Sequence, residues 1–305
     1  RINGYHAVMG SASGGNPNPL SGAGATMFMG KYVGETKTDT AELYATGPFE
    51  LFGREHELVV GASASRAEWD GKGYYDASYN RNVANFYTWN GDVGMPNWGA
   101  PFLFNDQTTR QTGSYITARF KPSDDLALIL GSRFANYSLT GDTYSKETGR
   151  VIPYAGAVYD LDRNFSLYAS YTSIFKPQTL PDRNNKPLEP DEGDNYEVGI
   201  KGEFFDGRLN ASLAWFEIKQ DNRAEADLNY NATPSYPGLG YAYVGTKAKT
   251  KGIEAEISGE LAPGWQAQAG YTHKVIRDSD GDKVSTWEPE DQFSLCLLYT
   301  SPSPR

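Results

Sequence analysis

The fold is decided by residues 154–178, which read YAGAVYDLDRNFSLYASYTSIFKPQ. From Phe165 to Tyr171, after the short turn at 161–164, every second residue is apolar or aromatic. Successive side chains of an extended strand point to opposite faces, so this segment has one apolar face and one polar face. The stretch predicts two antiparallel strands joined by a tight turn.

The same two-residue alternation recurs at 196–200, 209–215, 253–257 and 265–271. It suits a soluble antiparallel sheet with one face in water as well as a sheet with one face in lipid. In the second case the polar residues of these segments line a wet lumen, where charges cost little. The residues expected to face this lumen are Glu197, Lys201, Glu254, Glu256, Gln266 and Gln268.

Short and long connections alternate along the chain, and this favours the lipid interpretation. An outer-membrane β-barrel has short periplasmic turns and long extracellular loops. The sequence therefore predicts an all-β, transmembrane antiparallel β-barrel of about twelve strands. The short turns fall at 52–55, 121–125, 161–164, 205–207 and 262–264, and the long connections at 69–106, 139–149, 176–192, 221–240 and 277–290. The strands are expected at 2–12, 26–51, 56–69, 107–120, 125–138, 150–160, 165–175, 194–204, 208–220, 241–261, 265–276 and 291–295.

The composition agrees with a barrel. The 305 residues have a mean hydropathy of −0.58 and no apolar run of the length that a membrane helix needs, but a barrel strand needs only alternate residues to be apolar. A net charge of −10 without a polybasic stretch argues against a nucleic-acid partner. Several aromatic residues lie near strand ends, as interfacial girdles require: Tyr44, Phe49, Phe120, Tyr137, Tyr159, Phe175 and Phe204.

The two ends of the sequence predict a fragment. The chain starts inside a strand-like segment at 2–8, and the final residues CLLYTSPSPR, 296–305, break the strand pattern. These ten residues resemble the translation of a sequencing adaptor, the alternative being a natural proline-punctuated tail. We therefore expect a partial barrel at 1–295, an artefactual tail at 296–305 and, without Cys296, no cysteine chemistry.

Residues 154–178 and 188–215, followed by 252–257 and 264–271, resemble TonB-dependent outer-membrane receptors for ferric siderophores. The upstream stretch GPFELFGREHEL, 47–58, resembles the subgroup that takes hydroxamate-type and pyoverdine-type siderophores. The resemblance covers essentially residues 1–295.

That resemblance implies a 22-stranded barrel, occluded by an N-terminal plug and energised through a TonB box, of which about twelve strands lie in this chain. The implied location is the outer membrane of a Gram-negative bacterium, among outer-membrane lipid and lipopolysaccharide. The implied partners are TonB, through the missing plug, and a ferric siderophore, which is the transported ligand and not an intrinsic cofactor. Receptors of the same class for cobalamin, haem or a saccharide are the alternative, and a passive porin or a barrel enzyme is more remote.

Candidate ligand contacts lie in the long connections, where aromatic residues cluster between Asn and Gly. Aromatic rings are stiff and amphipathic, so they can pack against a bulky iron chelate with little entropy loss. Arg110 or Arg223 could meet an anionic chelate. The alternative is that the rings only pack the loop against its neighbours. The expected aromatic contacts are Tyr87, Trp89, Trp98, Tyr236 and Tyr241.

No other group of residues in the sequence indicates a metal site or a catalytic site. Asp278-Ser-Asp-Gly-Asp282 lacks the glycine and glutamate positions of an EF-hand. The acidic run at 189–194 is interpreted as a solvated loop entrance. The three histidines have no paired ligand spacing, and no catalytic motif occurs. We expect no metal site and no enzymatic activity.

Overall fold

The computed structural model describes residues 2–13, 17–76, 78, 82–91, 95–227, 230, 242–284 and 288–299. Within these ranges the chain forms twelve β-strands. No helix in the described ranges could span a membrane. The strands are β1 (Ile2–Ser13), β2 (Thr26–Leu51), β3 (Arg54–Tyr74), β4 (Leu103–Phe120), β5 (Leu126–Gly141), β6 (Ser145–Asp160), β7 (Phe165–Lys176), β8 (Asp191–Phe204), β9 (Leu209–Ala226), β10 (Tyr243–Ala262), β11 (Trp265–Asp278) and β12 (Asp291–Tyr299).

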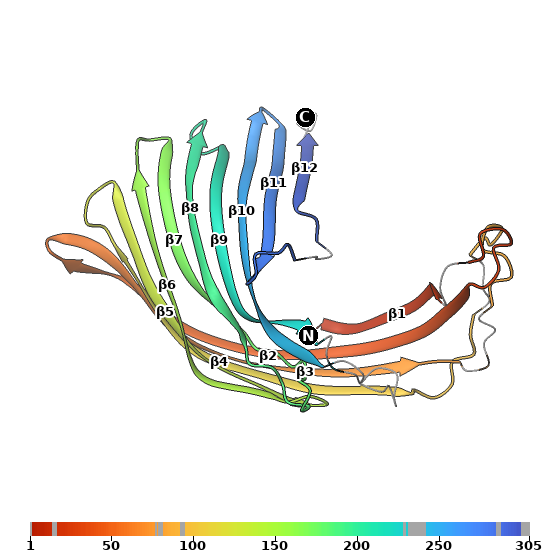
Figure 1. The fold of residues 1–305 in the computed structure, drawn as a ribbon. Coiled ribbons are helices and arrows are strands. Elements are labelled where there is room, and N and C mark those ends of the chain that lie inside the picture. The colour runs from red at the N-terminus through yellow and green to blue at the C-terminus, as the bar shows by residue number, and fades with distance from the viewer. Residues whose placement is uncertain are drawn as a thin grey trace, which may run out of the picture. The chain divides into compact units, whose positions relative to one another are not determined.

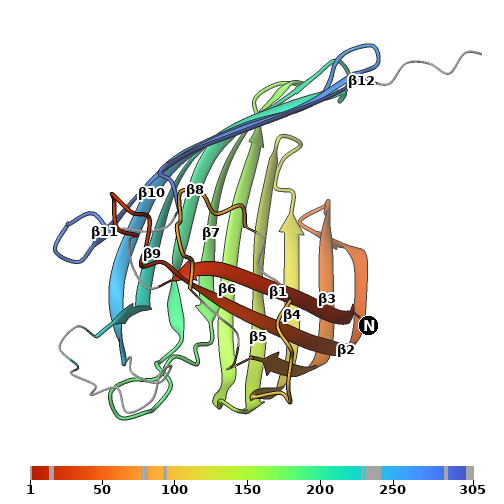
Figure 2. The same ribbon diagram turned by 90° about the vertical axis from the view of Figure 1, so that its right-hand side faces the viewer.

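The twelve strands form one sheet whose order is the order of the sequence, from β1 to β12 (Figure 1). Neighbouring strands such as β7 and β8 pair antiparallel, and β6 to β9 lie side by side in Figure 2 as well. Antiparallel neighbours can be joined by short hairpins, so no crossover is needed. The predicted antiparallel arrangement of about twelve strands is confirmed.

Several strands run further than the alternation predicted. β3 extends to Tyr74, β4 begins at Leu103 and β9 ends at Ala226. The connection expected at 139–149 was wrong, because only 142–144 separate β5 from β6. At these strand ends both faces are rich in polar residues, so apolar and polar residues no longer alternate there. The backbone pairing continues all the same.

β12 also passes the expected boundary at residue 295. Cys296 lies opposite Gln268, and Tyr299 lies opposite Trp265. The rings of Trp265 and Tyr299 lie 5.0 Å apart. Residues 296–299 therefore take part in the sheet, while the adaptor origin of 296–305 stays a prediction.

The chain divides into two compact units. The first contains a small buried cluster of Ala25, Met29 and Val83. The second contains the whole of β6 to β12. The first unit comprises Arg1–Ala41, Ala64–Gln111 and Ser138–Tyr144, and the second Glu42–Ser63, Thr112–Tyr137 and Ser145–Arg305.

One face of the sheet in the second unit is apolar and exposed. Val198, Trp215 and Ile253 lie opposite one another on β8, β9 and β10, and directly opposed residues share a face. Their exposed fractions are 50%, 41% and 44%. Such large apolar side chains in solvent would be costly, so this face is the one that meets lipid.

The other face of the same strands is polar. Lys201 lies opposite Ser212, which in turn lies opposite Glu256. The Lys201 ammonium lies 4.8 Å from the centre of the Tyr168 ring. These groups belong to the face predicted to line the lumen.

The turn at Phe52-Gly53 marks the short-turn end of the second unit. Both residues have positive φ, 53° and 72°, which is the backbone of a two-residue hairpin loop that matches strand twist. Nearby, His56 is buried and holds this end together. Its Nε2 hydrogen-bonds the Leu51 carbonyl at 3.1 Å, and its Nδ1 accepts from the Lys121 N–H at 2.9 Å. The histidine has a structural role at this turn.

Exchanging one residue on each face tests which face meets lipid. Leu213→Arg places a charge on the apolar face and should destabilise the folded protein by about 2–4 kcal/mol. Ser212→Arg, one residue away on the polar face, should cost less than about 1 kcal/mol. The measurement is the free energy of unfolding in urea with the protein in lipid vesicles. Equal costs for the two variants would contradict the assignment of faces.

Candidate functional site

The connection between β3 and β4, which carries three of the seven predicted ligand contacts, is anchored to residues 17–25. The Phe86 N–H donates to the Gly22 carbonyl at 2.8 Å, and the Val83 N–H donates to the Ala25 carbonyl at 3.1 Å. Asn18 caps the partner segment, since its side-chain oxygen accepts the Leu20 and Ser21 N–H groups. The aromatic connection is therefore a docked element of the first unit.

The structure brings Tyr87, Trp89 and Trp98 together in this docked element. Trp89 and Trp98 are partly buried and pack on the cluster of Ala25, Met29 and Val83. Phe86 links two of the three rings, because its centre lies 6.4 Å from both Tyr87 and Trp89. The two tryptophans therefore contribute to packing, as the alternative interpretation of these rings expected.

Tyr87 is the ring of this group that is most open to solvent. Its exposed fraction is 61%, and its hydroxyl donates to the Pro19 carbonyl at 3.2 Å. The Tyr87 N–H donates to the Asn85 side chain at 2.9 Å. A ring that is exposed and also oriented by its neighbours is suited to stacking on a ligand.

The remaining predicted contacts lie elsewhere. Arg110 is exposed on β4 and belongs to the first unit. Arg223, on β9 in the second unit, forms an ion pair with Glu225 at 2.6 Å. Its Nε is buried and has no hydrogen-bond partner among the described residues. Tyr236 and Tyr241 lie outside the described residues.

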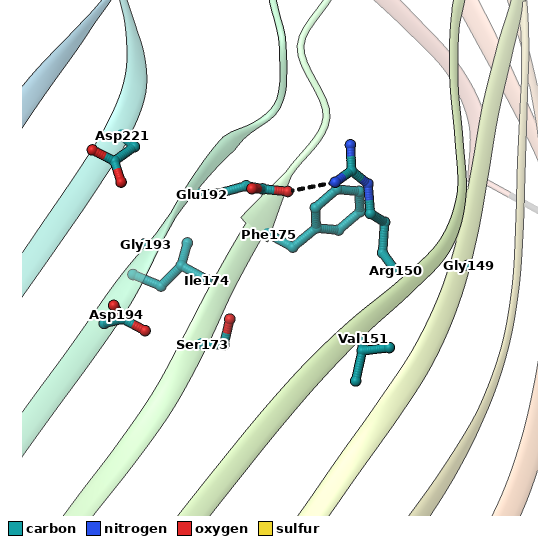
Figure 3. A pocket seen from close by; sticks show the side chains of 10 residues that line it. All are labelled: Gly149, Arg150, Val151, Ser173, Ile174, Phe175, Glu192, Gly193, Asp194 and Asp221. Carbon is teal, nitrogen blue, oxygen red and sulfur yellow. Dashed lines mark hydrogen bonds and ion pairs between the residues drawn. The ribbon is translucent and has the colours of Figure 1, made fainter.

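A second candidate site is a hollow of about 420 Å³ in the second unit, at the long-loop ends of β6, β7, β8 and β9 (Figure 3). Arg150 is one of its lining residues. The guanidinium donates to Glu192 at 3.0 Å and to Glu147 at 2.8 Å, and it lies 5.5 Å from the centre of the Phe175 ring. These contacts fix the guanidinium in place.

The hollow is acidic overall. Glu192, Asp194 and Asp221 line it, and Arg150 is the one basic side chain among the described residues that line it. A site of this charge suits hydrogen-bond donors or cationic groups of a ligand rather than its carboxylates. The described residues hold no cluster of His, Cys, Asp and Glu that could bind a metal ion.

Sequence reasoning missed this hollow. It interpreted Glu192 and Asp194 as part of a solvated loop entrance and placed Arg150 at the start of a strand. The strand register is what brings the group together, because Phe175 lies opposite Glu192 and Glu192 lies opposite Asp221. The acidic run at 189–194 was the available signal, but its pairing with Arg150 and Asp221 on other strands cannot be inferred from charge alone.

The connection at 177–190 is fastened to the neighbouring connection beyond β9. Arg183 forms an ion pair with Asp227, and the Tyr243 N–H donates to the Pro181 carbonyl at 2.9 Å. Within the loop, the Lys186 N–H donates to the Asp182 carboxylate at 2.9 Å and lowers the pKa of Asp182. Asp227 and Tyr243, next to the ends of β9 and β10, thus hold the 177–190 connection in place within the second unit.

Residues 3–302 match the family described as TonB dependent receptor-like, beta-barrel. The chain belongs to this family. Its curated relatives include the ferripyoverdine receptor of Pseudomonas aeruginosa, 58% identical over 303 residues that make up 98% of this chain and 37% of the relative. The ferric-pyoverdine BN7/BN8 receptor of Pseudomonas putida is 41% identical over 308 residues, which cover 93% of this chain and 36% of the relative.

A solved structure agrees with the sequence comparison. The crystal structure of the outer-membrane ferripyoverdine receptor of P. aeruginosa, bound to ferripyoverdine, is 57% identical with a TM-score of 0.85. It is matched over 99% of this chain and 40% of its own length. The chain thus spans little more than a third of the curated relatives it matches.

Membership of this family confirms the resemblance inferred from residues 154–178 and 188–215. It confirms the transmembrane β-barrel fold and the location in the outer membrane of a Gram-negative bacterium. The family consists of receptors, which favours the receptor interpretation over a passive porin or a barrel enzyme.

The docking of the aromatic connection can be tested at two glycines. Gly22 and Gly24 both have positive φ, 67° and 100°. A Cβ at Gly22 would lie 2.2 Å from Asn85 Oδ1, whereas a Cβ at Gly24 would have no atom within 4 Å. Gly22→Ala should therefore loosen the connection and accelerate amide hydrogen exchange at Val83 and Phe86 by about tenfold or more.

Gly24→Ala is the matched control, because it adds similar backbone strain without the collision. It should leave exchange at these two amides nearly unchanged. Equal acceleration in both variants would show that backbone strain, and not contact with the aromatic connection, determines the result.

Proposed function

We propose that this chain is the barrel portion of an outer-membrane receptor that imports ferric siderophores of the pyoverdine type. The observation that carries the proposal is the 58% identity to the ferripyoverdine receptor of P. aeruginosa over nearly the whole chain. The P. putida relative, itself a ferric-pyoverdine receptor, supports the same ligand class at 41% identity. The ferric siderophore is cargo in this proposal, and the protein needs no intrinsic cofactor.

Transport would be energised by TonB. The family takes its name from this dependence, and the relatives are nearly three times as long as the part matched here. In the proposal, a plug and a TonB box carried by the remainder of the receptor close the barrel and receive the energy. The chain described here contributes the wall and the ligand-facing connections.

The aromatic connection would bind the siderophore. Tyr87 is exposed and oriented for stacking, while Trp89 and Trp98 hold the connection on its buried cluster. Tyr236 and Tyr241, in the connection between β9 and β10, remain proposed contacts. Arg110 and Arg223 are proposed to meet anionic groups of the chelate.

The binding proposal predicts the effect of removing both tryptophans. Trp89→Ala combined with Trp98→Ala, in the full-length receptor, should weaken ferric pyoverdine binding at least about 30-fold, the equivalent of one aromatic hot spot. The same variant should reach the outer membrane in normal amounts, because neither ring belongs to the strands. The measurement is the dissociation constant from quenching of siderophore fluorescence.

Trp265→Ala is the control. This tryptophan is 46% exposed and follows the short turn before β11, so its removal should leave the affinity unchanged. Cobalamin and a hydroxamate chelate serve as comparison ligands. Unchanged affinity in the double variant would refute the proposed site, and preference for cobalamin over ferric pyoverdine would refute the proposed ligand class.

A further inference from the structure

Tyrosine rings on the polar face of the second unit lie over glycines of neighbouring strands. A Cβ at Gly131 would lie 2.6 Å from Cε2 of Tyr154. A Cβ at Gly61 would lie 2.9 Å from Cε1 of Tyr115. Carbon atoms in contact are about 3.5–4.0 Å apart, so each ring occupies the space that a side chain at the glycine would need. We call the following the tyrosine–glycine pairs: Tyr115 with Gly61, Tyr154 with Gly131, and Tyr168 with Gly199.

The strand register places these rings on the polar face. Tyr168 lies opposite Gly199, which is two residues from Lys201 on β8. Tyr154 lies opposite Thr172, which is four residues from Tyr168 on β7. Since every second residue of a strand shares a face and opposed residues share it too, both tyrosines lie on the same face as Lys201. This is the face predicted to line the lumen.

The Tyr154 side chain reaches across a whole strand. It starts on β6, crosses Gly131 on β5 and forms a hydrogen bond with the Thr117 hydroxyl on β4. These three strands are consecutive neighbours in the sheet. The ring is therefore held against the sheet at both ends, by its own backbone and by its hydroxyl group.

Tyr115 repeats this arrangement two strands earlier. Its side chain starts on β4, crosses Gly61 on β3 and donates a hydrogen bond to Glu42 on β2 at 3.0 Å. Tyr115 is two residues from Thr117 on the same strand, so it shares the face of Tyr154. The two tyrosines together lie along the polar face from β2 to β6.

A ring that lies along the sheet departs from the usual direction of a strand side chain. Side chains in strands stand roughly perpendicular to the sheet, so a tyrosine in that position would project its ring away from the wall. The glycine on the next strand removes the side chain that would keep the ring from lying down. Glycine weakens the interior of a strand and often marks a place where another chain or a ligand comes close. Its position under these rings therefore points to a need for free space in front of the polar face.

We propose that Gly61 and Gly131 are positioning residues for transport. By letting Tyr115 and Tyr154 lie against the wall, they keep the space in front of it open for movement of the plug and passage of the ferric siderophore. The inference rests on the proposed function, which assigns a plug to the remainder of the receptor. The proposed ligand contacts lie in the long connections, so these glycines should affect the rate of transport and not the affinity for the ligand.

The test is Gly131→Ala in the full-length receptor. The added methyl group would collide with the Tyr154 ring and turn it away from the wall. The maximal rate of ferric pyoverdine uptake per receptor should fall at least about fivefold, because conformational movement sets the rate of many such processes. The dissociation constant for ferric pyoverdine should not change. The measurements are uptake of radioactive iron and the number of siderophore-binding sites on the same cells, and Gly61→Ala should act in the same way through Tyr115.

Gly156→Ala is the matched control. Gly156 lies on the same face, two residues from Tyr154, and a Cβ there would have its nearest neighbours at 3.6 and 3.9 Å. This variant should transport at the normal rate. A second comparison removes the ring: Gly131→Ala combined with Tyr154→Ala should transport as fast as Tyr154→Ala alone, because the methyl group matters only when the ring is present. That comparison remains valid if Gly131→Ala by itself folds poorly.

Four results would overturn the proposal. Equal losses of uptake rate in Gly131→Ala and Gly156→Ala would show that the strand itself needs glycine. Slower transport by the double variant than by Tyr154→Ala would show an effect of the methyl group that is independent of the ring. A loss of affinity that accounts for the loss of uptake would place the effect in ligand binding, and fewer binding sites with a normal rate per receptor would place it in folding. Absence of ferric pyoverdine uptake by the unmodified receptor would contradict the proposed function, a result that the variants cannot produce.

Discussion

The structure depends on one constraint, that every backbone N–H and C=O group within a hydrocarbon layer needs a partner in the protein. A sheet whose neighbours in sequence are also neighbours in space meets this need with hairpins alone. One face of such a sheet then contacts lipid, and the other face contacts water. Val198, Trp215 and Ile253 therefore share one face, and Lys201, Ser212 and Glu256 share the other.

The same constraint favours the ends of the strands as the place of the proposed ligand contacts. Within the lipid layer the outward side chains are committed to apolar contacts, so recognition requires residues that lie beyond it. The structure has two candidate groups of residues at these strand ends. The aromatic connection is docked through Gly22 and Ala25, whereas the acidic hollow around Arg150 is built on the strands themselves.

The alternation of apolar and polar residues predicted the strand segments that lie within the lipid layer, because one face of those segments has to be apolar. The strand expected at 165–175 is Phe165–Lys176, and the one at 265–276 is Trp265–Asp278. The alternation failed above the membrane, where β9 continues to Ala226, because no apolar face is required there. Aromatic content located Tyr87, Trp89 and Trp98, but their division into an exposed ring and two packed rings depends on contacts with residues 19–29, far away in sequence. The hollow around Arg150 depends on the pairing register of the strands, which cannot be predicted from the amino-acid composition.

The most direct test of the two-faced sheet is a cysteine scan along β9 in the full-length receptor in lipid bilayers. With Cys296 replaced by Ser, single cysteines at 211–216 would carry a spin label whose collisions with oxygen and with an aqueous nickel chelate are measured. The two-faced sheet predicts an alternation of period two, with oxygen favoured at Leu213 and Trp215 and the nickel chelate favoured relative to oxygen at Ser212 and Ala214. Uniform accessibility, or the opposite phase, would contradict it.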